Sequence, residues 1–491
     1  MNSIGIDIGT TTLSFVVVDS ENKIQKSITI PNDSKIPTAH SWEHLQESSR
    51  ILELVKEQLD ILLAKYPNMN SIGLTGQMHG ILYVDENGDA ISPLYTWQDE
   101  RGNLKNSNLG ASQMAELEAS AGLSLVEEVK QTVGVAVASG YGLVTHIWNL
   151  RNNNVPENSC KICTIADYIG MKLTNRKTPI LHASNAASLG FFDVENGMFM
   201  ESVLAESGVD KSILPAIEIE VKEIGCYQNT PVKIAIGDNQ ASFAGSSRVV
   251  VEELDEGGAV VAKKSEENVL MNIGTGSQIS ALVDEYVEIS GIEIRPYMDG
   301  KYLLVGASLC GGRAYAILER FLREWTIISG SALIKEEKEA ESQYENMLNA
   351  AWKAYEDRNH SYEKQSHSYG NRNDGYEKKK FLQVQTTFQG TRQNPDMTGS
   401  IYNITEDNFT PGNIILGFIE GILSELFQMY DTIKKATNIE CKTLVASGNG
   451  IRKNPLMQQM AKDIFEMEIQ IPYCVEEAAY GVAICSGENI V

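Results

Sequence analysis

Stretches of apolar residues at two different spacings alternate along the chain. Residues 4–19, "IGIDIGTTTLSFVVVD", predict two buried strands separated by a Gly-Thr turn, and "SIGLTG" at 71–76 predicts another strand. Between them, residues 42–66 place apolar side chains at helical spacing. Much later, Pro411 opens a long helical pattern, and "TLVASG" at 443–448 predicts one more strand. Strands and helices that alternate in this way are typical of an α/β protein.

The opening hairpin has a counterpart in the second half of the chain. Residues 268–284, "NVLMNIGTGSQISALVD", align with it without a gap, so that Asp284 falls on Asp19. A strand, a Gly-Thr turn, a strand and a terminal Asp thus recur about 265 residues apart. The pattern predicts two related halves that face one another. Hairpin chemistry alone also produces short repeats of this kind, and that alternative stays open here.

The chain has 491 residues, more than one hydrophobic core normally holds, so two or three domains are expected. Residues 248–268 are charged and contain a Gly pair, and we interpret them as the crossing between the halves. Residues 330–380 become polar and poor in aliphatic side chains. They predict an insertion with a helical start on the surface, one that tolerates removal of residues 358–378.

The overall charge and the cysteine count narrow the function classes. A net charge of -24 and a pI near 4.8 argue against nucleic acid as a partner, because its phosphates would be repelled. The start lacks a signal-peptide pattern and no run of about 18 apolar residues occurs, so we expect a cytoplasmic protein without a membrane partner. Seven cysteines fit reduced thiols. Cys160 and Cys163 lack a second ligand pair, and we interpret them as buried strand thiols rather than a zinc site.

The two Gly-Thr turns carry candidate chemistry. Such a turn gathers backbone N–H groups and hydroxyls at one point, which suits phosphate oxygens, and two facing turns would hold a polyphosphate from both sides. Asp7 precedes the first turn and Asn272 the second. A carboxylate beside phosphates indicates Mg²⁺, which binds one or two carboxylates together with phosphate oxygens. The alternative is a plain hairpin whose Asp and Thr side chains hydrogen-bond locally.

A second candidate site lies in "KIAIGDNQASFAGSS" at 233–247. An apolar strand ends at Gly237, and Asp238 follows where a helix of small residues begins. Asp caps helices well, so a purely structural role is one interpretation. The carboxyl end of a strand is also where α/β proteins bind their ligands. Both roles are compatible at this position.

Seven motifs follow one another along the chain in an order that is specific although each motif alone is weak. Together they resemble the FGGY carbohydrate kinases, which share a superfamily fold with actin and hexokinase. The resemblance implies two actin-like, ribonuclease H-like ATPase domains facing a central cleft, with the sugar site and the catalytic Asp in residues 1–247 and the nucleotide site in 248–491. The motifs are "GIDIGTTT" near the start, "TGQMHG" at 75–80, "YTWQDERG" at 95–102, "IGDNQAS" at 236–242, "NIGTGSQIS" at 272–280, "FQGTR" at 388–392 and "ASGNGIRKNPLMQQMAKDIF" at 446–465.

This resemblance implies that ATP and Mg²⁺ are used to transfer a phosphoryl group to a primary hydroxyl of a sugar. Asp238 matches the catalytic base of the family, and Asp7 matches the residue on the metal side. The sugar pocket is implied at Gln77, Met78, His79, Trp97, Asp99, Arg101 and Asn239, although core packing is the alternative for His79 and Trp97. The phosphate and adenosine motifs are implied at Thr10, Thr11, Thr12, Gly274, Thr275, Gly276, Ser277, Gly311, Gly448, Asn449, Gly450 and Asn454.

Within the family, "SPLYTWQDERG", "SNAASLGFFDV" and "LVGASLCGGRAYAILERF" resemble the sedoheptulokinase branch more than glycerol kinases. Xylulokinases share the Gln-Met-His-Gly loop and the Asp-Asn pair, and they are the alternative. The expected partner is therefore a small ketose, and a homodimer is the expected assembly. One departure is Ser14, where many members carry Lys or Arg. A non-catalytic sugar sensor and an ATP-dependent conformational switch on the same fold also remain open.

Overall fold

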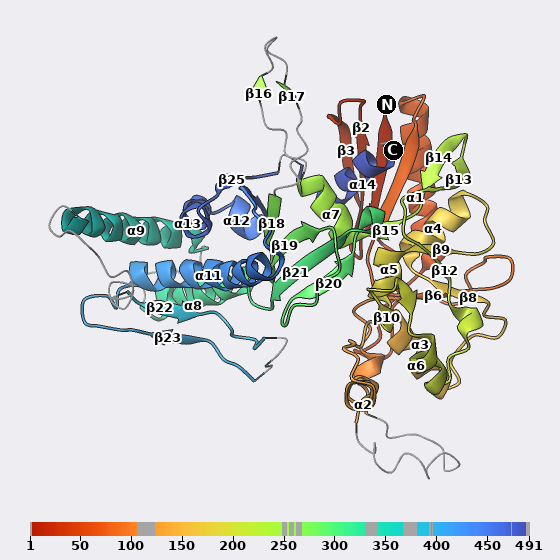
Figure 1. Ribbon diagram of the computed structural model, residues 1–491, viewed down its shortest axis with the longest axis horizontal. Coiled ribbons are helices and arrows are strands. Elements are labelled where there is room, and N and C mark those ends of the chain that lie inside the picture. Colours follow the sequence, from red (N-terminus) through yellow and green to blue (C-terminus); the bar gives the residue numbers. More distant parts are fainter. Residues whose placement is uncertain are drawn as a thin grey trace.

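A computed structural model describes residues 2–105, 123–247, 253–254, 260–261, 268–329, 342–366, 381–391, 394, 396–472 and 474–487, with side chains of 253–254, 260–261 and 361–366 left aside. Its elements form two lobes, each built on one twisted sheet (Figure 1). Most of the proposed crossing at 248–268, two stretches of the proposed insertion (330–341 and 367–380) and Arg392 lie outside the described residues.

The sheet of the first lobe grows outward from the opening hairpin. Strands β1 (Ser3–Ile8) and β2 (Thr12–Val18) are antiparallel and almost fully buried, because branched apolar side chains fill both faces. The order is β13-β14-β5-β1-β2-β3, with β5 (Ser71–Gly76) parallel to β1. The other members are β3 (Ile24–Pro31), β13 (Glu223–Tyr227), β14 (Thr230–Lys233) and the short β15 (Ile236–Gly237), which pairs with the end of β5.

The second lobe repeats this plan. Strands β18 (Asn268–Ile273) and β19 (Ser277–Val283) form its hairpin, and each of their four boundaries lies 265 positions after the corresponding boundary of β1 and β2. The order is β20-β21-β19-β18-β24-β25, so a third antiparallel strand again flanks the hairpin and a parallel strand again follows on its other side. The remaining members are β20 (Glu293–Pro296), β21 (Tyr302–Ser308), β24 (Thr443–Ser447) and β25 (Glu468–Gln470).

Helices cover both sheets. In the first lobe these are α1 (Ser48–Lys65), α2 (Leu125–Thr132), α3 (Gly142–Arg151), α4 (Ile165–Leu173), α5 (Ala183–Ser188), α6 (Glu201–Glu206) and α7 (Asp238–Ser247). In the second they are α8 (Gly312–Ile328), α9 (Tyr344–Ser366), α11 (Pro411–Thr437), α12 (Asn449–Arg452) and α13 (Pro455–Phe465). The predicted helix at 42–66 begins only at Ser48, because residues 42–47 enter the short strand β4 (Leu45–Gln46) and its approach.

Short strands and 3₁₀ turns make up the rest of the described structure. They are β6 (Leu82–Val84), β7 (Leu94–Tyr95), β8 (Lys161–Cys163), β9 (Ile180–His182), β10 (Phe192–Asp193), β11 (Met198–Phe199), β12 (Ala216–Glu218), β16 (Glu253–Leu254), β17 (Val260–Val261), β22 (Gln383–Gln385), β23 (Ser400–Tyr402), η1 (Arg101–Asn103), η2 (Lys211–Ile213) and η3 (Met298–Gly300). Cys163 is buried in β8 as expected, whereas Cys160 just before it is exposed, which corrects the interpretation of both thiols as buried.

The last helix, α14 (Glu477–Gly487), crosses back from the second lobe to the first. It packs on β1, β2, β5 and α7, beside the red strands in Figure 1. Small residues permit the contact: a Cβ on Gly481 would lie 1.9 Å from the Ala241 carbonyl oxygen, and one on Gly5 would lie 1.8 Å from that of Ala479. The predicted boundary assigns these residues to the second domain, but they complete the core of the first.

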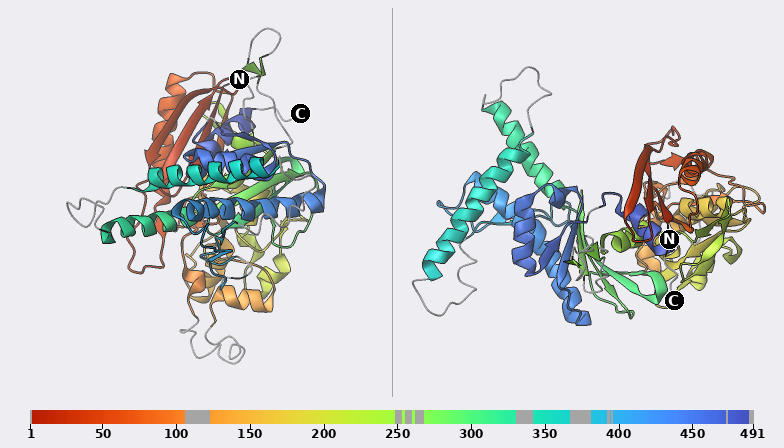
Figure 2. Two further views of the ribbon diagram at one scale, coloured as in Figure 1. Left: turned by 90° about the vertical axis from the view of Figure 1, so that its left-hand side faces the viewer. Right: turned by 90° about the horizontal axis from the view of Figure 1, so that it is seen from above.

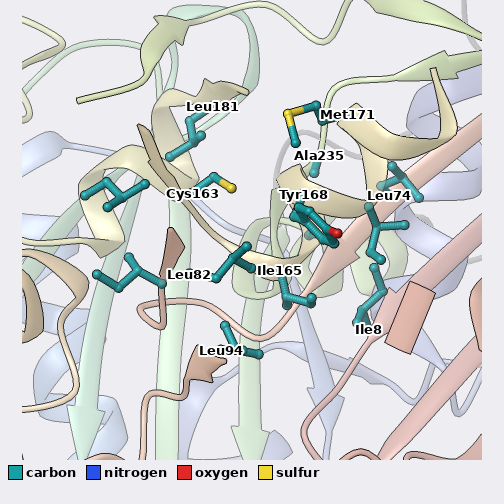
Figure 3. Close-up of a cluster of buried hydrophobic side chains, with 14 of the residues drawn as sticks. Ile8, Leu74, Leu82, Leu94, Cys163, Ile165, Tyr168, Met171, Leu181 and Ala235 are labelled. Atoms are coloured by element: carbon teal, nitrogen blue, oxygen red, sulfur yellow. The ribbon is translucent and has the colours of Figure 1, made fainter. Parts of the chain in front are cut away.

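The core of the first lobe joins its main sheet to the α4 layer. Tyr168 and Ile165 on α4 and Cys163 on β8 meet Leu74 of β5 and Ile8 of β1, all buried (Figure 3). Ile8 closes β1 immediately before the Gly-Thr turn, and Leu74 lies two residues before the end of β5. This packing therefore fixes the strand ends from which the candidate site residues project.

The segment interpreted as an insertion is in part a core element. Helix α9 runs alongside α11 (Figure 2), and its Met347 and Ala351 are fully buried in the second core. Arg358 forms an ion pair with Glu420 of α11 at 2.7 Å. The expected surface excursion is therefore wrong for residues 344–358, because alternate turns of a mostly polar helix carry the few apolar side chains that pack. No helix among the described residues is long and apolar enough to cross a membrane.

Candidate active site

Asp238 stands at the first position of α7, directly after β15. The strand is held at the sheet edge because Thr75 donates a hydrogen bond to the Ile236 carbonyl at 2.8 Å and the Gly237 N–H donates to Ser184 Oγ at 2.9 Å. A Cβ on Gly237 would lie 2.4 Å from Gln240 Oε1 and 2.7 Å from the Met78 methyl carbon, so a larger residue at this turn would require those two buried side chains to move. The carboxylate of Asp238 is thereby presented at the carboxyl end of the sheet, where ligands bind in α/β proteins.

The charges around Asp238 come from both lobes. Burial raises the pKa of Asp238, while hydrogen bonds from Asn239 and the charge of Arg295 lower it. Arg295 lies on β20 of the second lobe, where Glu293 pairs with its guanidinium at 2.5 Å. Burial also raises the pKa of Asp7 to about 7, and the negative charges of Asp238 and Glu476 act in the same direction. The site thus carries an excess of negative charge that a bound cation would relieve.

The first Gly-Thr turn is hydrogen-bonded to two of the predicted sugar residues. Trp97 Nε1 donates to Thr10 Oγ1 at 3.0 Å, and Thr10 Oγ1 donates to Gln77 Oε1 at 3.3 Å. Gln46 supports the same group by donating to the Thr10 carbonyl at 2.8 Å. The indole of Trp97 is 48% exposed, which excludes the core-packing alternative for this residue. Thr11 and Thr12 are exposed at the same turn.

His79 is held in a conformation that few residues adopt. Its φ of +73° lies in the left-handed region, and its Nδ1 lies 2.7 Å from the Ser188 carbonyl oxygen. The ring stacks on Tyr141 with centroids 4.7 Å apart. Strained backbone of this kind persists where the surroundings over-determine it and is common at functional sites. The neighbouring Met78 is buried, with its sulfur 3.9 Å from Asn239 Nδ2.

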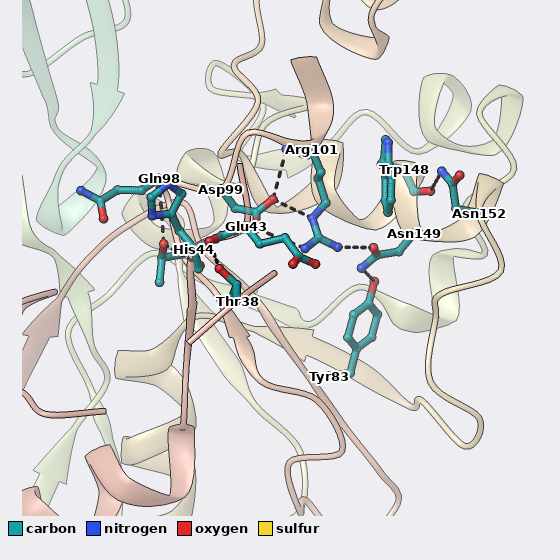
Figure 4. Close-up of polar contacts among 11 residues, drawn as sticks. Thr38, Glu43, His44, Tyr83, Gln98, Asp99, Arg101, Trp148, Asn149 and Asn152 are labelled. Atoms are coloured by element: carbon teal, nitrogen blue, oxygen red, sulfur yellow. Dashed lines mark hydrogen bonds and ion pairs between the residues drawn. The ribbon is translucent and has the colours of Figure 1, made fainter. Parts of the chain in front are cut away.

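Asp99 and Arg101, which the resemblance assigns to the sugar pocket, form an internal ion pair in the structure, and their contact with a sugar stays a prediction. Both are buried, and Arg101 Nε donates to Asp99 Oδ1 at 2.6 Å (Figure 4). The guanidinium also donates to Asn149 Oδ1 at 2.7 Å and lies 4.2 Å from the centre of the Tyr95 ring. The chemistry of these two side chains is therefore satisfied inside the protein, and they hold the loop that carries Trp97.

The second Gly-Thr turn opens onto a pocket of about 1020 Å³ in the second lobe. Gly448, at φ +87°, brings the adenosine motif against the Ile273 carbonyl, which a Cβ would approach to 2.5 Å. Asn454 caps α13 by accepting a hydrogen bond from the Met457 N–H at 3.0 Å. Gly311 packs against the back of the second turn. The lining contains Gly274, Thr275, Gly312, Arg313, Tyr315, Ala316, Tyr344, Glu345, Leu348, Gly448, Asn449, Gly450, Lys453, Asn454 and Met457.

The second turn and the pocket fit a phosphate-bearing ligand by their chemistry. Glycine backbones approach closely, and Arg313 and Lys453 supply positive charge. The Ser277 hydroxyl at the turn is buried and has no hydrogen-bond partner among the described residues. Buried polar groups without partners are costly in a folded protein unless a ligand or water satisfies them.

The structure also shows which contacts Ser14 makes at the position where many family members carry Lys or Arg. The Ser14 hydroxyl donates to Glu476 Oε2 at 2.6 Å, and Thr29 donates to Oε1 at 2.9 Å. The next residue, Glu477, accepts hydrogen bonds from Ser447 at 2.6 Å and from Ser246 at 2.9 Å. Glu476 and Glu477, at the start of α14, thus join the first hairpin, α7 and β24.

Several site residues are absent from the sequence-based set because they come from the opposite lobe or have no motif. Gln278, the residue after the second turn, donates to Asn239 Oδ1 at 3.3 Å and so links the second turn to α7. Tyr141, Arg295, Tyr344 and Glu476 likewise belong to no motif quoted from the sequence. Arg313 lies within "LVGASLCGGRAYAILERF", but that motif assigns it no role of its own.

Comparison with known proteins agrees with this geometry. Residues 2–245 match the N-terminal domain of the FGGY family of carbohydrate kinases, and residues 269–487 match its C-terminal domain. A sedoheptulokinase of Mus musculus is 24% identical over 98% of this chain and 96% of its own length. In the solved structures, a xylulose kinase from Rhodospirillum rubrum superposes with a TM-score of 0.72 at 16% identity, covering 100% of this chain and 91% of that one.

A Plasmodium falciparum glycerol kinase solved with ADP superposes with a TM-score of 0.69 at 19% identity, covering 99% of this chain and 88% of that one. These structural neighbours share the two-lobed, actin-like arrangement of paired sheets seen here. With both family domains matched in order over nearly its whole length, this chain belongs to the FGGY family of carbohydrate kinases.

Proposed function

We propose that this sugar kinase uses ATP and Mg²⁺ to phosphorylate the primary hydroxyl of a ketose, with sedoheptulose as the substrate and sedoheptulose 7-phosphate as the product. One arrangement carries the proposal: residues of the predicted sugar site and residues of both phosphate turns are hydrogen-bonded to each other. Trp97 and Gln77 bind Thr10 of the first turn, and Asn239, beside Asp238, binds Gln278 after the second. A phosphoryl donor and a sugar are thereby brought to the same point.

The residues divide the chemistry between them. Asp238 accepts the proton of the sugar hydroxyl as that oxygen bonds to phosphorus and ADP leaves. Asp7 would supply a carboxylate to Mg²⁺, and phosphate oxygens of the nucleotide would supply further ligands. Arg313 and Lys453 balance the negative charge of the phosphates. They supply the positive charge that many family members place at the position of Ser14.

The sedoheptulose assignment rests on motifs in "LYTWQD", "NAASLGFF" and "GASLCGG" and on the full-length similarity to a sedoheptulokinase. If the sugar lies between the Trp97 loop and Asp238, a ketose shorter than seven carbons leaves polar groups unpaired or misplaces its hydroxyl. A misplacement of about 1 Å costs about a hundredfold in rate. D-Xylulose is the second candidate, because a xylulose kinase superposes over the whole chain.

The test measures ADP release with ATP, Mg²⁺ and a panel of ketoses. We expect kcat/KM for sedoheptulose to exceed that for D-xylulose and D-ribulose by about tenfold or more, with glycerol poorer still. A preference for D-xylulose would overturn the sedoheptulose assignment and would still support the proposed phosphoryl transfer to a ketose. Sugar binding without turnover would support the sensor alternative, and ATP turnover that ignores every sugar would support the switch.

A further inference from the structure

The lining of the nucleotide pocket falls into two chemical classes. Glycines and threonine from the second turn, α8 and α12, together with Arg313 and Lys453, make a polar part suited to phosphates. The other part is aromatic and aliphatic, and it comes from α8, α9 and α13. Its members are Tyr315, Ala316, Tyr344, Leu348 and Met457. An apolar part with aromatic rings is what a purine base requires.

Tyr344 is the most accessible ring in this apolar part. Its side chain is 45% exposed although one face already stacks on Tyr315, with ring centroids 5.8 Å apart and planes 22° apart. Tyr315 itself is buried. A ligand that covers Tyr344 would therefore bury the exposed face of a ring whose other face already stacks on Tyr315.

Helix α9 is fixed firmly enough to hold Tyr344 in place. The Gln343 N–H, just before the helix, donates to Glu319 Oε1 of α8 at 3.1 Å. Met347 and Ala351 are buried in the core, and a Cβ on Gly412 of α11 would lie 2.6 Å from the Ala350 carbonyl oxygen. Further along, Tyr355 hydrogen-bonds to Asp463 of α13. Helix α9 is thus packed against α8, α11 and α13, independently of its contacts with the pocket.

We propose that α9 forms one wall of the purine site, with Tyr344 contacting the base and Leu348 packing beside it. The proposal rests on the proposed function, since it concerns the nucleotide of that reaction. It assigns a binding role to a segment whose polar composition predicts a dispensable insertion.

Calorimetric titration of ADP into the full-length protein with Mg²⁺ tests this wall. We expect Tyr344→Ala to weaken ADP binding about tenfold, because stacking on an aromatic ring contributes substantially to the binding of each base. Leu348→Ala weakens it in the same direction, and KM for the sugar at saturating ATP stays unchanged. Tyr344→Phe keeps the ring and stays within about threefold of the parent.

Asn349→Ala, at an exposed position of the same helix outside the pocket lining, is the matched control and binds ADP as the parent does. Parent-like ADP affinity in both Tyr344→Ala and Leu348→Ala would overturn the wall while leaving the kinase function intact. Failure of the parent itself to bind ADP would instead count against the proposed function. If Tyr344→Ala does not fold, as judged from its melting curve, the Leu348→Ala result decides.

Discussion

At the scale of single residues, Asp238 is the group whose chemistry the proposal depends on most. Asp238→Asn keeps the shape of the side chain but cannot accept the hydroxyl proton, so sugar-dependent turnover should fall by about two orders of magnitude or more. Folding and ADP binding should stay close to the parent. The measurements are ADP release with sugar, a melting curve and an ADP titration. Turnover within tenfold of the parent would remove Asp238 from the role of base.

Buried histidines make the stability of the first lobe depend on pH. Burial lowers the pKa of His146 to about 4, and its Nδ1 lies 2.9 Å from the Tyr83 hydroxyl. Above pH 6.5 the imidazole is neutral in both the folded and the unfolded chain, so His146 does not affect the free energy of unfolding. Between pH 6.5 and pH 4 the unfolded chain binds a proton at this residue and the folded chain does not. The free energy of unfolding therefore falls as the pH drops toward 4. Asp7 and Asp167, with pKa values raised to about 7, act in the opposite direction and mask this loss.

A variant separates these opposing contributions. In His146→Gln, the difference in unfolding free energy between pH 7.5 and pH 5.5 should shift by about 1.4 kcal/mol relative to the parent, in favour of stability at the lower pH. Urea denaturation of both proteins at the two pH values measures it. An identical pH dependence in parent and variant would mean that His146 titrates normally in the folded protein.

At the scale of elements, the contact between α7 and α14 tolerates no added side-chain atom. The Cβ of Gly481→Ala would meet the Ala241 carbonyl oxygen at 1.9 Å, so the two helices must separate, and we expect a loss of more than about 2 kcal/mol of unfolding free energy. Gly170→Ala in α4 is the matched control, because its Cβ would meet only side-chain carbons, at 3.1 Å. Equal stabilities of the two variants in urea would contradict the close packing.

The sequence predicts elements well where they are locally determined. Both hairpins, β5, β24 and α11 lie where periodicity and turn residues place them, because alternation and capping act within a few residues. Asp99, Arg101 and α9 show the limit. A charged pair in a motif and a polar helix look exposed in sequence, and only long-range packing reveals that the pair is satisfied internally and the helix half-buried. Arg295 and Tyr344 could not be predicted because they approach the site from elements distant in sequence, and Gln278, although it lies in "NIGTGSQIS", gave no sign of its contact with Asn239.

At the scale of the whole molecule, one of the hydrogen bonds that join the lobes, from Gln278 to Asn239, lies next to the proposed base Asp238. We expect sugar and a non-hydrolysable ATP analogue together to bring the lobes closer, since water near the transferred phosphoryl group would otherwise compete with the sugar. Small-angle scattering and protease digestion should show a smaller radius of gyration and slower cleavage with both ligands, and smaller changes with either alone. Unchanged scattering and digestion with both ligands would argue that the lobes are already closed.

The return of α14 to the first lobe has a consequence for how the protein is made. On the ribosome, β1, β2 and β5 emerge long before Glu477–Gly487, yet that helix covers their sheet and packs its backbone against Gly5 and Gly73. The first lobe therefore cannot reach its final packing as soon as its own strands are synthesised. The apolar face of its sheet stays uncovered until the second lobe and α14 have been translated. We therefore expect the first lobe to complete its packing after translation, and its early half to be the part that most needs chaperone protection.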